Sequence, residues 1–293
     1  MTKFYARVAL ALWLLTSAPL YAHEFWLSAS GTERLLAGDT ASLTLHVGEF
    51  FKGEQLGFSA PLTSTFRLYT ATGNKDLRSL LPMRTAVSTV ALPLTTAGTY
   101  LITFDSQPNR IDLSADRFHA YLHDEGLDAI KKQREVAGTA EKPVRERYRR
   151  YVKTMVQVGR QANADADAPV QTATPVDKTY AVKTGQRLEI VPLVNPLLMS
   201  PGDKLTVQLL FEGKPLAGAL FKAWHQHDDQ TLMIRATSSP DGFASFNLPY
   251  AGPWMISVVH MVSANDIKVT DWDSLWGNLT FVVPSVNSPR VSN

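Results

Sequence analysis

The sequence predicts a mainly β protein built from two immunoglobulin-like or transthyretin-like β-sandwiches with a helical insert between them. Three observations predict this fold: short runs of alternating apolar and polar residues, turn signals that separate these runs regularly, and helical spacing of apolar residues in the middle of the chain. The expected segments are a first sandwich over residues 23–113, the insert over 114–162, a linker over 163–180 and a second sandwich over 181–293.

The same order of signals occurs twice along the chain. A Gly-Asp turn precedes an alternating run, and an Ala-Gly turn later precedes a strand led by an aromatic residue. Gly and Asp supply turn conformations, and the alternation buries one face of each strand. The signals are at residues 38–39, 41–47, 97–98 and 100–104 in the first copy, and at 202–203, 204–210, 251–252 and 254–259 in the second.

The insert is expected to begin with one amphipathic helix. Ser114 or Asp116 supplies a side chain able to cap its amino terminus. Apolar residues then recur at the three- and four-residue spacing of a helix face, at Phe118, Tyr121, Leu122, Leu127 and Ile130.

A second helix is expected over residues 144–160, because Gly138 and Pro143 interrupt the first. This segment is strongly basic, with tyrosines among the cations. We interpret the cluster either as a solvated helix face or as a surface that binds an anion. Its cations are Arg145, Arg147, Arg149, Arg150 and Lys153.

The first 22 residues have the three parts of a secretory signal. Lys3 and Arg7 form its positively charged first part, residues 8–15 form its apolar core, and small residues lead to a cleavage site at Ala22. The apolar run is shorter than the roughly 20 residues that span a bilayer. We therefore expect export to the periplasm, with cleavage after Ala22 and a mature chain that begins at His23.

Composition narrows the classes of function. The full chain has 29 Lys and Arg against 27 Asp and Glu, and cleavage removes Lys3 and Arg7, which leaves 27 of each. A neutral chain has no electrostatic footprint for nucleic acid, so no such partner is expected. The absence of cysteine excludes disulfides, thiolate metal sites and a cysteine nucleophile.

No sequence motif indicates an enzyme. The chain lacks a metalloprotease H-E-x-x-H, a phosphate-binding loop and the G-x-S-x-G turn of serine hydrolases. Asp271 and Asp273 flank Trp272 in a pattern typical of a turn before a strand. We therefore expect a binding protein without a catalytic step.

His23 is the residue most indicative of chemistry. At a mature amino terminus it carries an α-amine and an imidazole within one residue, and the two can chelate one metal ion. An α-amine has a pKa of about 7.7–8.0, so a neutral amine is accessible near physiological pH. Nitrogen donors of this kind suit Cu(II), Ni(II), Co(II) and Zn(II). A second histidine would complete a brace, and His260, at the end of an apolar strand, is the best partner.

The other histidines are weaker candidates. His225 and His227 share one face if their segment is extended, which suits a metal pair but is also typical of a polar hairpin end. His119 and His123 are one helical turn apart, on what we interpret as an exposed helix face. His46 lies within a strand and is expected to pack there.

With these residues in place, the chain resembles the DUF4198 family, exported bacterial proteins often described as periplasmic components of nickel or cobalt uptake systems. The likeness covers nearly the whole mature chain. It is carried by residues 22–27, Gly38, Asp39, residues 43–48, Phe118, Tyr121, Leu122, residues 125–127, residues 147–151, Lys153, residues 188–192, Asn195, Pro196, residues 213–216, Asp241, Gly242, Gly252, Trp254, His260, Trp272, Trp276 and residues 279–281.

The resemblance implies a periplasmic protein that captures or delivers Ni(II) or Co(II), with Cu(II) as an alternative, and an inner-membrane metal transporter as its partner. His23 and His260 fall on the family's characteristic histidines, so these two are the expected metal ligands. Two other interpretations stay open. One is a copper oxidase that uses a histidine brace, and the other is a carbohydrate-binding or adhesion-type sandwich without metal.

Overall fold

The computed structural model describes residues 23–30, 35–160, 177–227 and 230–285. These residues form mainly β-strands arranged in three sheets, so the predicted mainly β fold is confirmed. The predicted signal and residues 163–176 of the predicted linker lie outside the described residues.

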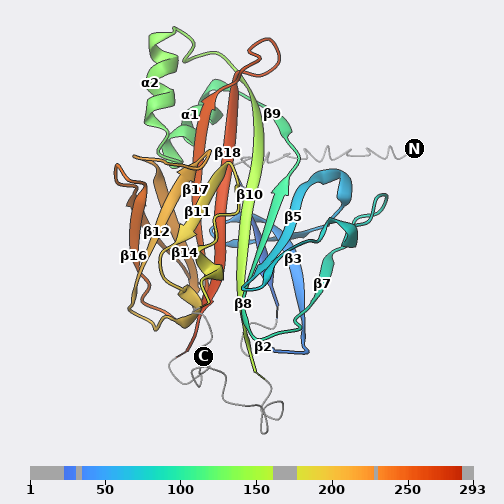
Figure 1. The fold of residues 1–293 in the computed structure, drawn as a ribbon. Helices are drawn as coiled ribbons and strands as arrows, with labels where there is room; N and C mark the ends of the chain where they lie inside the picture. The colour runs from blue at the N-terminus through green and yellow to red at the C-terminus, as the bar shows by residue number, and fades with distance from the viewer. Residues whose placement is uncertain (1–22, 31–34, 161–176, 228–229, 286–293) are drawn as a thin grey trace, which may run out of the picture.

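A ten-stranded central sheet runs through the whole molecule (Figure 1). Its two halves meet where β10 pairs in parallel with β18, from Glu146 opposite Trp272 to Thr154 opposite Thr280. In spatial order the main path is β15 (Gln230–Thr237), β14 (Leu220–His227), β17 (Gly252–Ser263), β18 (Trp272–Val283), β10 (Val144–Gly159), β8 (Gly98–Ser106), β5 (Thr63–Thr70) and β6 (Gly73–Asp76), and β10 also pairs with β2 (Leu35–Leu36) and β9 (Asn109–Leu113).

A four-stranded sheet covers each half of the central sheet, which gives two sandwiches that share one sheet. The N-terminal sheet contains β1 (Glu24–Ala29), β3 (Thr40–Glu49), β4 (Lys52–Leu56) and β7 (Thr89–Pro93). The C-terminal sheet contains β11 (Leu188–Pro192), β12 (Lys204–Phe211), β13 (Lys214–Pro215) and β16 (Phe243–Asn247).

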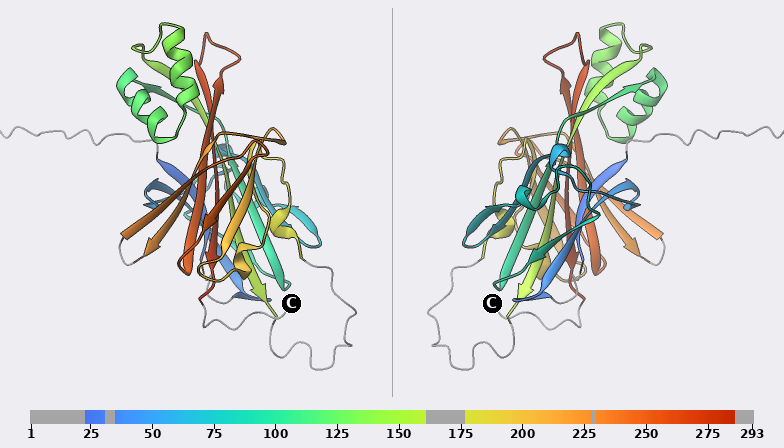
Figure 2. Two further views of the ribbon diagram at one scale, coloured as in Figure 1. Left: turned by 90° about the vertical axis from the view of Figure 1, so that its left-hand side faces the viewer. Right: turned by 90° about the vertical axis from the view of Figure 1, so that its right-hand side faces the viewer.

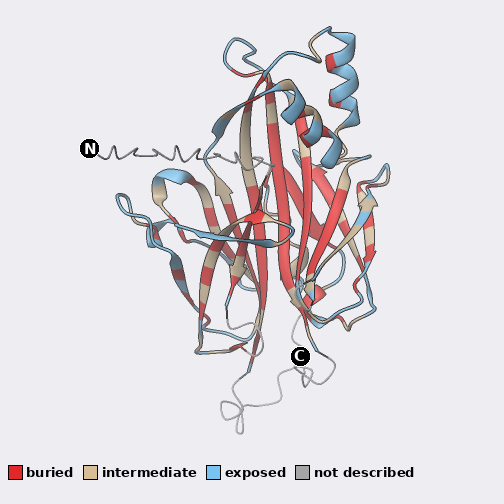
Figure 3. Cartoon of the chain, turned by 180° about the vertical axis from the view of Figure 1, so that it is seen from behind, coloured by how far each residue is buried: buried red, intermediate tan, exposed pale blue. Residues whose placement is uncertain are grey.

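Each sandwich has its own buried core. In the first, Leu27 and Leu43 of the N-terminal sheet pack with Phe66, Ile102 and Val156 of the central sheet. In the second, the C-terminal sheet and the other half of the central sheet contribute Leu205, Phe246, Phe221, Trp254 and Leu279. The middle strands of the central sheet are buried along most of their length (Figure 3), because both faces are covered.

The repeated turn signals form the same structure in both sandwiches. In the first, the Gly38 amide donates to the Leu94 carbonyl at 2.7 Å, and the Leu94 amide returns a hydrogen bond to Asp39 at 2.8 Å. The Asp39 carboxylate accepts from the Leu36 amide at 2.8 Å. Gly38 has a φ of 100°, a conformation that glycine adopts without strain.

The second copy repeats this pattern bond for bond. The Gly202 amide donates to the Leu248 carbonyl at 2.6 Å, and the Leu248 amide donates to Asp203 at 3.1 Å. The Asp203 carboxylate accepts from the Ser200 amide at 2.7 Å. Because the turns match in detail, strands β3 and β12, which follow them, begin in an equivalent way.

Two short helices lie at one end of the long central strands (Figure 2). Helix α1 (Ala115–Asp124) begins after Ser114, whose hydroxyl accepts from the Arg117 amide at 3.5 Å. Helix α2 is Asp128–Val136. The single predicted helix is therefore divided, because Gly126 lies between them with a φ of 65° that ends a right-handed helix. Among the described residues no helix is long and apolar enough to cross a membrane.

The second predicted helix is wrong, because residues 144–159 form strand β10. Its second half contains Val152, Val156 and Val158, and β-branched residues favour strands that pack on both faces. Long-range pairing with β18 on one edge and β8 and β9 on the other overrides the local helical spacing. Strand alternation divides the basic cluster, since Arg147 and Arg149 project on the opposite face from Arg150.

Short 3-10 helices complete the described elements and connect strands at the edges of the sheets. They are η1 (Ala60–Leu62), η2 (Arg78–Leu80), η3 (Thr179–Ala181) and η4 (Pro196–Leu198).

Candidate metal-binding amino terminus

The backbone that follows His23 is held firmly against the central sheet. The Asn278 side-chain amide donates to the Phe25 carbonyl, and the Thr280 hydroxyl donates to the Leu27 carbonyl. Both donors come from β18 and lie on the face of the sheet over which β1 runs. Strand β1 is thus fixed on one side by this face and on the other by its pairing with β3.

Glu24 provides a second anchor at the same point. Its carboxylate is buried and accepts from the Ser257 hydroxyl at 2.9 Å. Burial raises the pKa of Glu24, and the nearby cations Lys222 and Arg150 act against that rise. Lys222 in turn forms a buried ion pair with Glu125, at 2.7 Å from nitrogen to oxygen. The residue next to the predicted terminus therefore belongs to a buried charge network.

The His23 ring lies beside an acidic side chain. Its Nε2 is 3.7 Å from Oε1 of Glu49, and both side chains are about one-third exposed, at 38% and 32%. The register of β1 and β3, with Glu24 opposite Gly48, places His23 next to the end of β3 where Glu49 lies. The structure thus brings together the imidazole and a carboxylate at an accessible edge.

Glu49 is positioned by an unusual hairpin turn between β3 and β4. The two central residues, Phe50 and Phe51, have φ values of 54° and 60°, which tight hairpins require but which Asn and Gly normally supply. Phe51 packs on the Trp26 ring with centroids 5.4 Å apart, and the Phe50 carbonyl accepts from the Gln226 side chain at 2.6 Å. Tertiary contacts hold the turn, and with it Glu49.

The close approach of β3 and β4 requires glycine. A Cβ on Gly48 would lie 2.0 Å from the Lys52 carbonyl oxygen, and one on Gly53 would lie 2.2 Å from the Val47 carbonyl oxygen. A methyl group at either position would force the strands apart. The glycines therefore determine where the hairpin places Glu49 relative to His23.

If the predicted signal is cleaved after Ala22, the donors at His23 suit a transition metal. The free α-amine and the imidazole Nδ1 would then chelate one ion through two nitrogens, which suits Ni(II), Co(II) and Cu(II), and the Glu49 carboxylate would accept a hydrogen bond from Nε2 on the other edge of the ring. Within the described ranges no group of three or more His, Cys, Asp or Glu side chains is arranged to hold a metal. The amine is therefore the donor on which this site depends.

His260 is not brought to His23. Ser257, which contacts Glu24, and His260 are three residues apart on β17, so they project from opposite faces of the central sheet. The His260 ring packs on Phe211 of the C-terminal sheet, with centroids 4.6 Å apart. Burial, with Arg187 nearby, lowers the pKa of His260. A whole sheet separates the two expected ligands.

His225 and His227 do lie on one face of β14, stacked with an aromatic neighbour. The His227 and Tyr250 ring centroids are 4.2 Å apart, and the His225 ring stacks on Trp254 at 4.6 Å. His225 Nδ1 is 2.8 Å from the Pro253 carbonyl, and its Nε2 is buried without a hydrogen-bond partner in the described structure. Their environment is an aromatic stack at the end of the strand.

The remaining histidines have separate surroundings. His46 stacks on Trp26 at 5.2 Å and is hydrogen-bonded through Nε2 to the Ser28 hydroxyl at 2.8 Å. Burial lowers the pKa of His46, which agrees with a packed strand residue. His119 is half-buried and His123 is exposed on α1.

The two aspartates of the D-W-D segment bind arginines of β10. Asp271 contacts Arg145 at 2.8 Å, and Asp273 contacts Arg147 at 2.6 Å. They fasten β18 to β10 at the end near the helices. Trp272 between them is buried in the small core beneath the helices.

Sequence reasoning did not find Glu49 or the anchoring role of Glu24. The sequence could have indicated the position of Glu49 only through the turn that follows it, but Phe50-Phe51 is not a typical turn sequence. Glu24 follows His23 directly, yet its burial depends on partners on β14 and β17 that are distant in sequence.

Comparison with known proteins identifies a family whose description names no activity. The family model described as "Domain of unknown function (DUF4198)" matches residues 20–262. A search of curated proteins finds no match.

Among solved structures, the human OSCAR ligand-binding domain is 12% identical, with 90% of this chain and 100% of that chain covered and a TM-score of 0.20. A Salmonella alpha-2-macroglobulin mutant is 10% identical, with 89% of this chain and 16% of that chain covered and a TM-score of 0.22. TM-scores this low identify no common fold, and nothing about this chain follows from them.

Proposed function

This chain belongs to the DUF4198 family, and we propose that it is an exported protein that binds one transition-metal ion at the mature amino terminus formed at His23. The metal is Ni(II) or Co(II), with Cu(II) as the alternative. Capture or delivery of the ion to an inner-membrane transporter is the role that we propose for the binding. No chemical step is part of the proposal.

The observation that carries the proposal is the fixed position of the terminus beside a carboxylate. A free terminus usually frays, and a frayed chelate loses affinity because binding must order it. Here Glu24, the residue directly after His23, is hydrogen-bonded to Ser257, and the Glu49 carboxylate lies 3.7 Å from the His23 ring. The donors are therefore pre-positioned, which favours tight binding.

The proposed ligands are the amine and Nδ1 of His23, without His260, because His260 faces the other sandwich. Glu49 lies at Nε2 and orients the His23 ring. Two nitrogen donors leave coordination positions for water or for a ligand from a partner protein, as transfer of an ion requires. Binding must weaken in acid, because the amine and imidazole have to release protons before they ligate.

The experiment is a metal titration of protein that has been processed in the periplasm and dialysed free of metal. Isothermal titration with Ni(II), Co(II) and Cu(II) should show one ion bound per chain. The variant His23→Ala should lose tight binding, and His123→Ala, which removes an exposed histidine on α1, should keep it. The proposal fails if processed wild-type protein binds none of the three ions, or if His23→Ala binds them as tightly.

The same protein distinguishes the two rival functions. If the copper-loaded protein consumes oxygen in the presence of a reductant and a polysaccharide, it is an oxidase. A metal-free protein that binds glycans would support the adhesion-type interpretation.

A further inference from the structure

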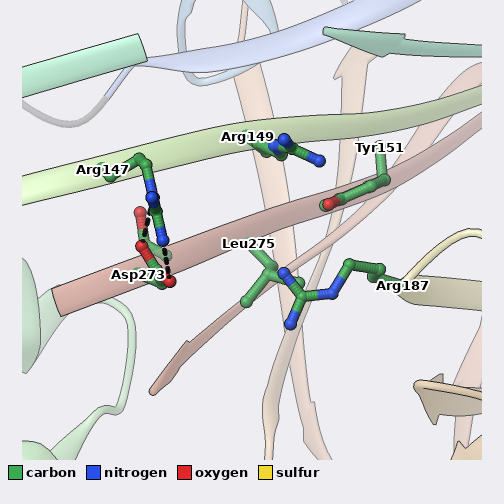
Figure 4. Close-up of a pocket in the computed structure, with 7 residues that line it drawn as sticks. Arg147, Arg149, Tyr151, Arg187, Asp273 and Leu275 are labelled. Atoms are coloured by element: carbon green, nitrogen blue, oxygen red, sulfur yellow. Dashed lines mark hydrogen bonds and ion pairs between the residues drawn. The ribbon is translucent and has the colours of Figure 1, made fainter. Parts of the chain in front are cut away.

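A pocket of about 150 Å³ lies on the face of the central sheet that packs toward the C-terminal sheet (Figure 4). Strand β10 contributes Arg147, Arg149 and Tyr151 to its lining, all projecting on the face toward the C-terminal sheet. Strand β18 contributes Leu275, directly opposite Arg149 in the parallel register. Arg187, just before β11, lines another side.

Two of the three arginines are already neutralised. Arg147 binds Asp273 through two hydrogen bonds, at 2.7 Å and 2.6 Å. Arg187 contacts Glu212 at 2.6 Å at the rim. Arg149 is half-buried and takes part in no ion pair with the residues that the structure describes. One positive charge therefore remains in the pocket.

The Tyr151 hydroxyl makes no hydrogen bond that meets the usual geometric criteria with any described residue, although Arg149 and Arg187 lie close to its oxygen. The residue is 4% exposed, and both of these neighbours are donors. In Figure 4 this oxygen points into the space bounded by Arg149, Leu275 and Arg187. Burial raises the pKa of Tyr151, while Arg149 and Arg187 act against the rise. A buried hydroxyl of this kind normally has a partner, so the pocket lacks an acceptor.

We propose that this pocket binds a small organic carboxylate that carries one negative charge. The planar Arg149 guanidinium matches a carboxylate through two parallel hydrogen bonds, and the Tyr151 hydroxyl donates a third. Leu275 forms an apolar wall for the carbon body of the ligand. This site is independent of the metal at His23.

Size and charge select this class of ligand. Pockets for drug-sized molecules measure roughly 300–1,000 Å³, so a smaller pocket suits a ligand of few heavy atoms. Because the paired Arg147 and Asp273 contribute no net charge, Arg149 alone balances the charge of a bound anion. A monocarboxylate therefore fits better than phosphate, which carries more than one charge near neutral pH.

The test is a titration of the full-length mature protein with acetate and lactate at constant ionic strength, with chloride as the balancing anion. Binding is followed by NMR of the amide groups, which also reports the location of the site. Resonances of β10 and of residues around Arg187 should shift in a saturable way. Phosphate is titrated separately under the same conditions.

Three variants report the assigned contacts. Arg149→Gln should weaken carboxylate binding by about tenfold or more, and Tyr151→Phe should weaken it by several-fold. Arg149→Lys keeps the charge but loses the planar fork, so its affinity should lie between wild type and Arg149→Gln. Arg78→Gln, an exposed arginine on η2, serves as the matched control and should bind as wild type.

Three results would overturn the assignment. The first is the absence of saturable shifts with either carboxylate in a protein whose spectrum shows it folded. The second is unchanged carboxylate affinity in folded Arg149→Gln or Arg149→Lys. The third is phosphate binding at these residues in preference to both carboxylates.

Discussion

The carboxylate of Glu24 accepts a hydrogen bond from the Ser257 hydroxyl at 2.9 Å, although 233 positions separate the two residues in the chain. The same hydroxyl accepts from the Trp224 indole nitrogen at 3.0 Å. These bonds fasten the beginning of β1 to the middle of the central sheet. His23, one residue earlier, therefore starts from a fixed point.

The variant Glu49→Gln should bind the metal about tenfold or more weakly than wild type, because an amide replaces the carboxylate beside the His23 ring. Calorimetric titration with Ni(II) measures the change. Glu54→Gln, an exposed carboxylate on β4 of the same hairpin, should bind normally. Equal losses in the two variants would indicate a general charge effect and would remove Glu49 from the site.

The variant His260→Ala should leave metal affinity unchanged. It should lower the free energy of unfolding by about 1–2 kcal/mol, because the Phe211 ring loses its packing partner. Urea unfolding and metal titration of the same preparation measure both effects. A large loss of metal affinity with unchanged stability would return His260 to the ligand set.

A buried ion pair between Lys153 of β10 and Glu189 of β11, at 2.6 Å, joins the central and C-terminal sheets. Glu189→Ala should cost about 3–5 kcal/mol of stability, because it leaves a buried ammonium without its partner. The double variant Lys153→Met with Glu189→Gln should recover most of this loss, since Gln still accepts from the Thr184 amide. Urea unfolding curves test both, and a double variant less stable than Glu189→Ala would contradict the explanation.

Burial raises the pKa of Asp105 from 3.8 to about 6. The folded state therefore binds this proton more tightly than the unfolded chain, and the contribution of Asp105 to stability falls as pH rises between about 4 and 6. Asp105→Asn keeps an acceptor for the Gln186 side chain, 2.6 Å away, and has no charge to bury. Its stability advantage over wild type should grow over that pH interval and stay constant above it. An advantage that does not depend on pH would contradict this.

Local signals in the sequence predicted the turns, the strands that follow them and the first helix. Asp39 and Asp203 determine their turns through bonds to amides three residues away, and Ser114 caps α1 through its immediate neighbours. Such contacts depend only on nearby residues, so a pattern in the sequence is sufficient to predict them.

The features that sequence reasoning missed depend on contacts between distant segments. The spacing of apolar residues in β10 favours a helix, whereas β18, the strand that pairs with it, is more than a hundred residues away in the sequence. Whether His260 faces His23 depends on the face of β17 from which it projects, relative to a strand at the other end of the chain. The Arg149 pocket likewise exists only because β10 is a strand.

The most direct test of the central claim is metal binding by protein that carries one extra residue before His23. The added residue converts the His23 amine into an amide, which is a poor ligand, while the imidazole and Glu49 stay in place. We predict that correctly processed protein binds Ni(II) tightly, and that the extended protein, folded equally well by circular dichroism, loses most of that affinity. Equal affinity in the two proteins would show that the amino-terminal amine is not a ligand and would contradict the account.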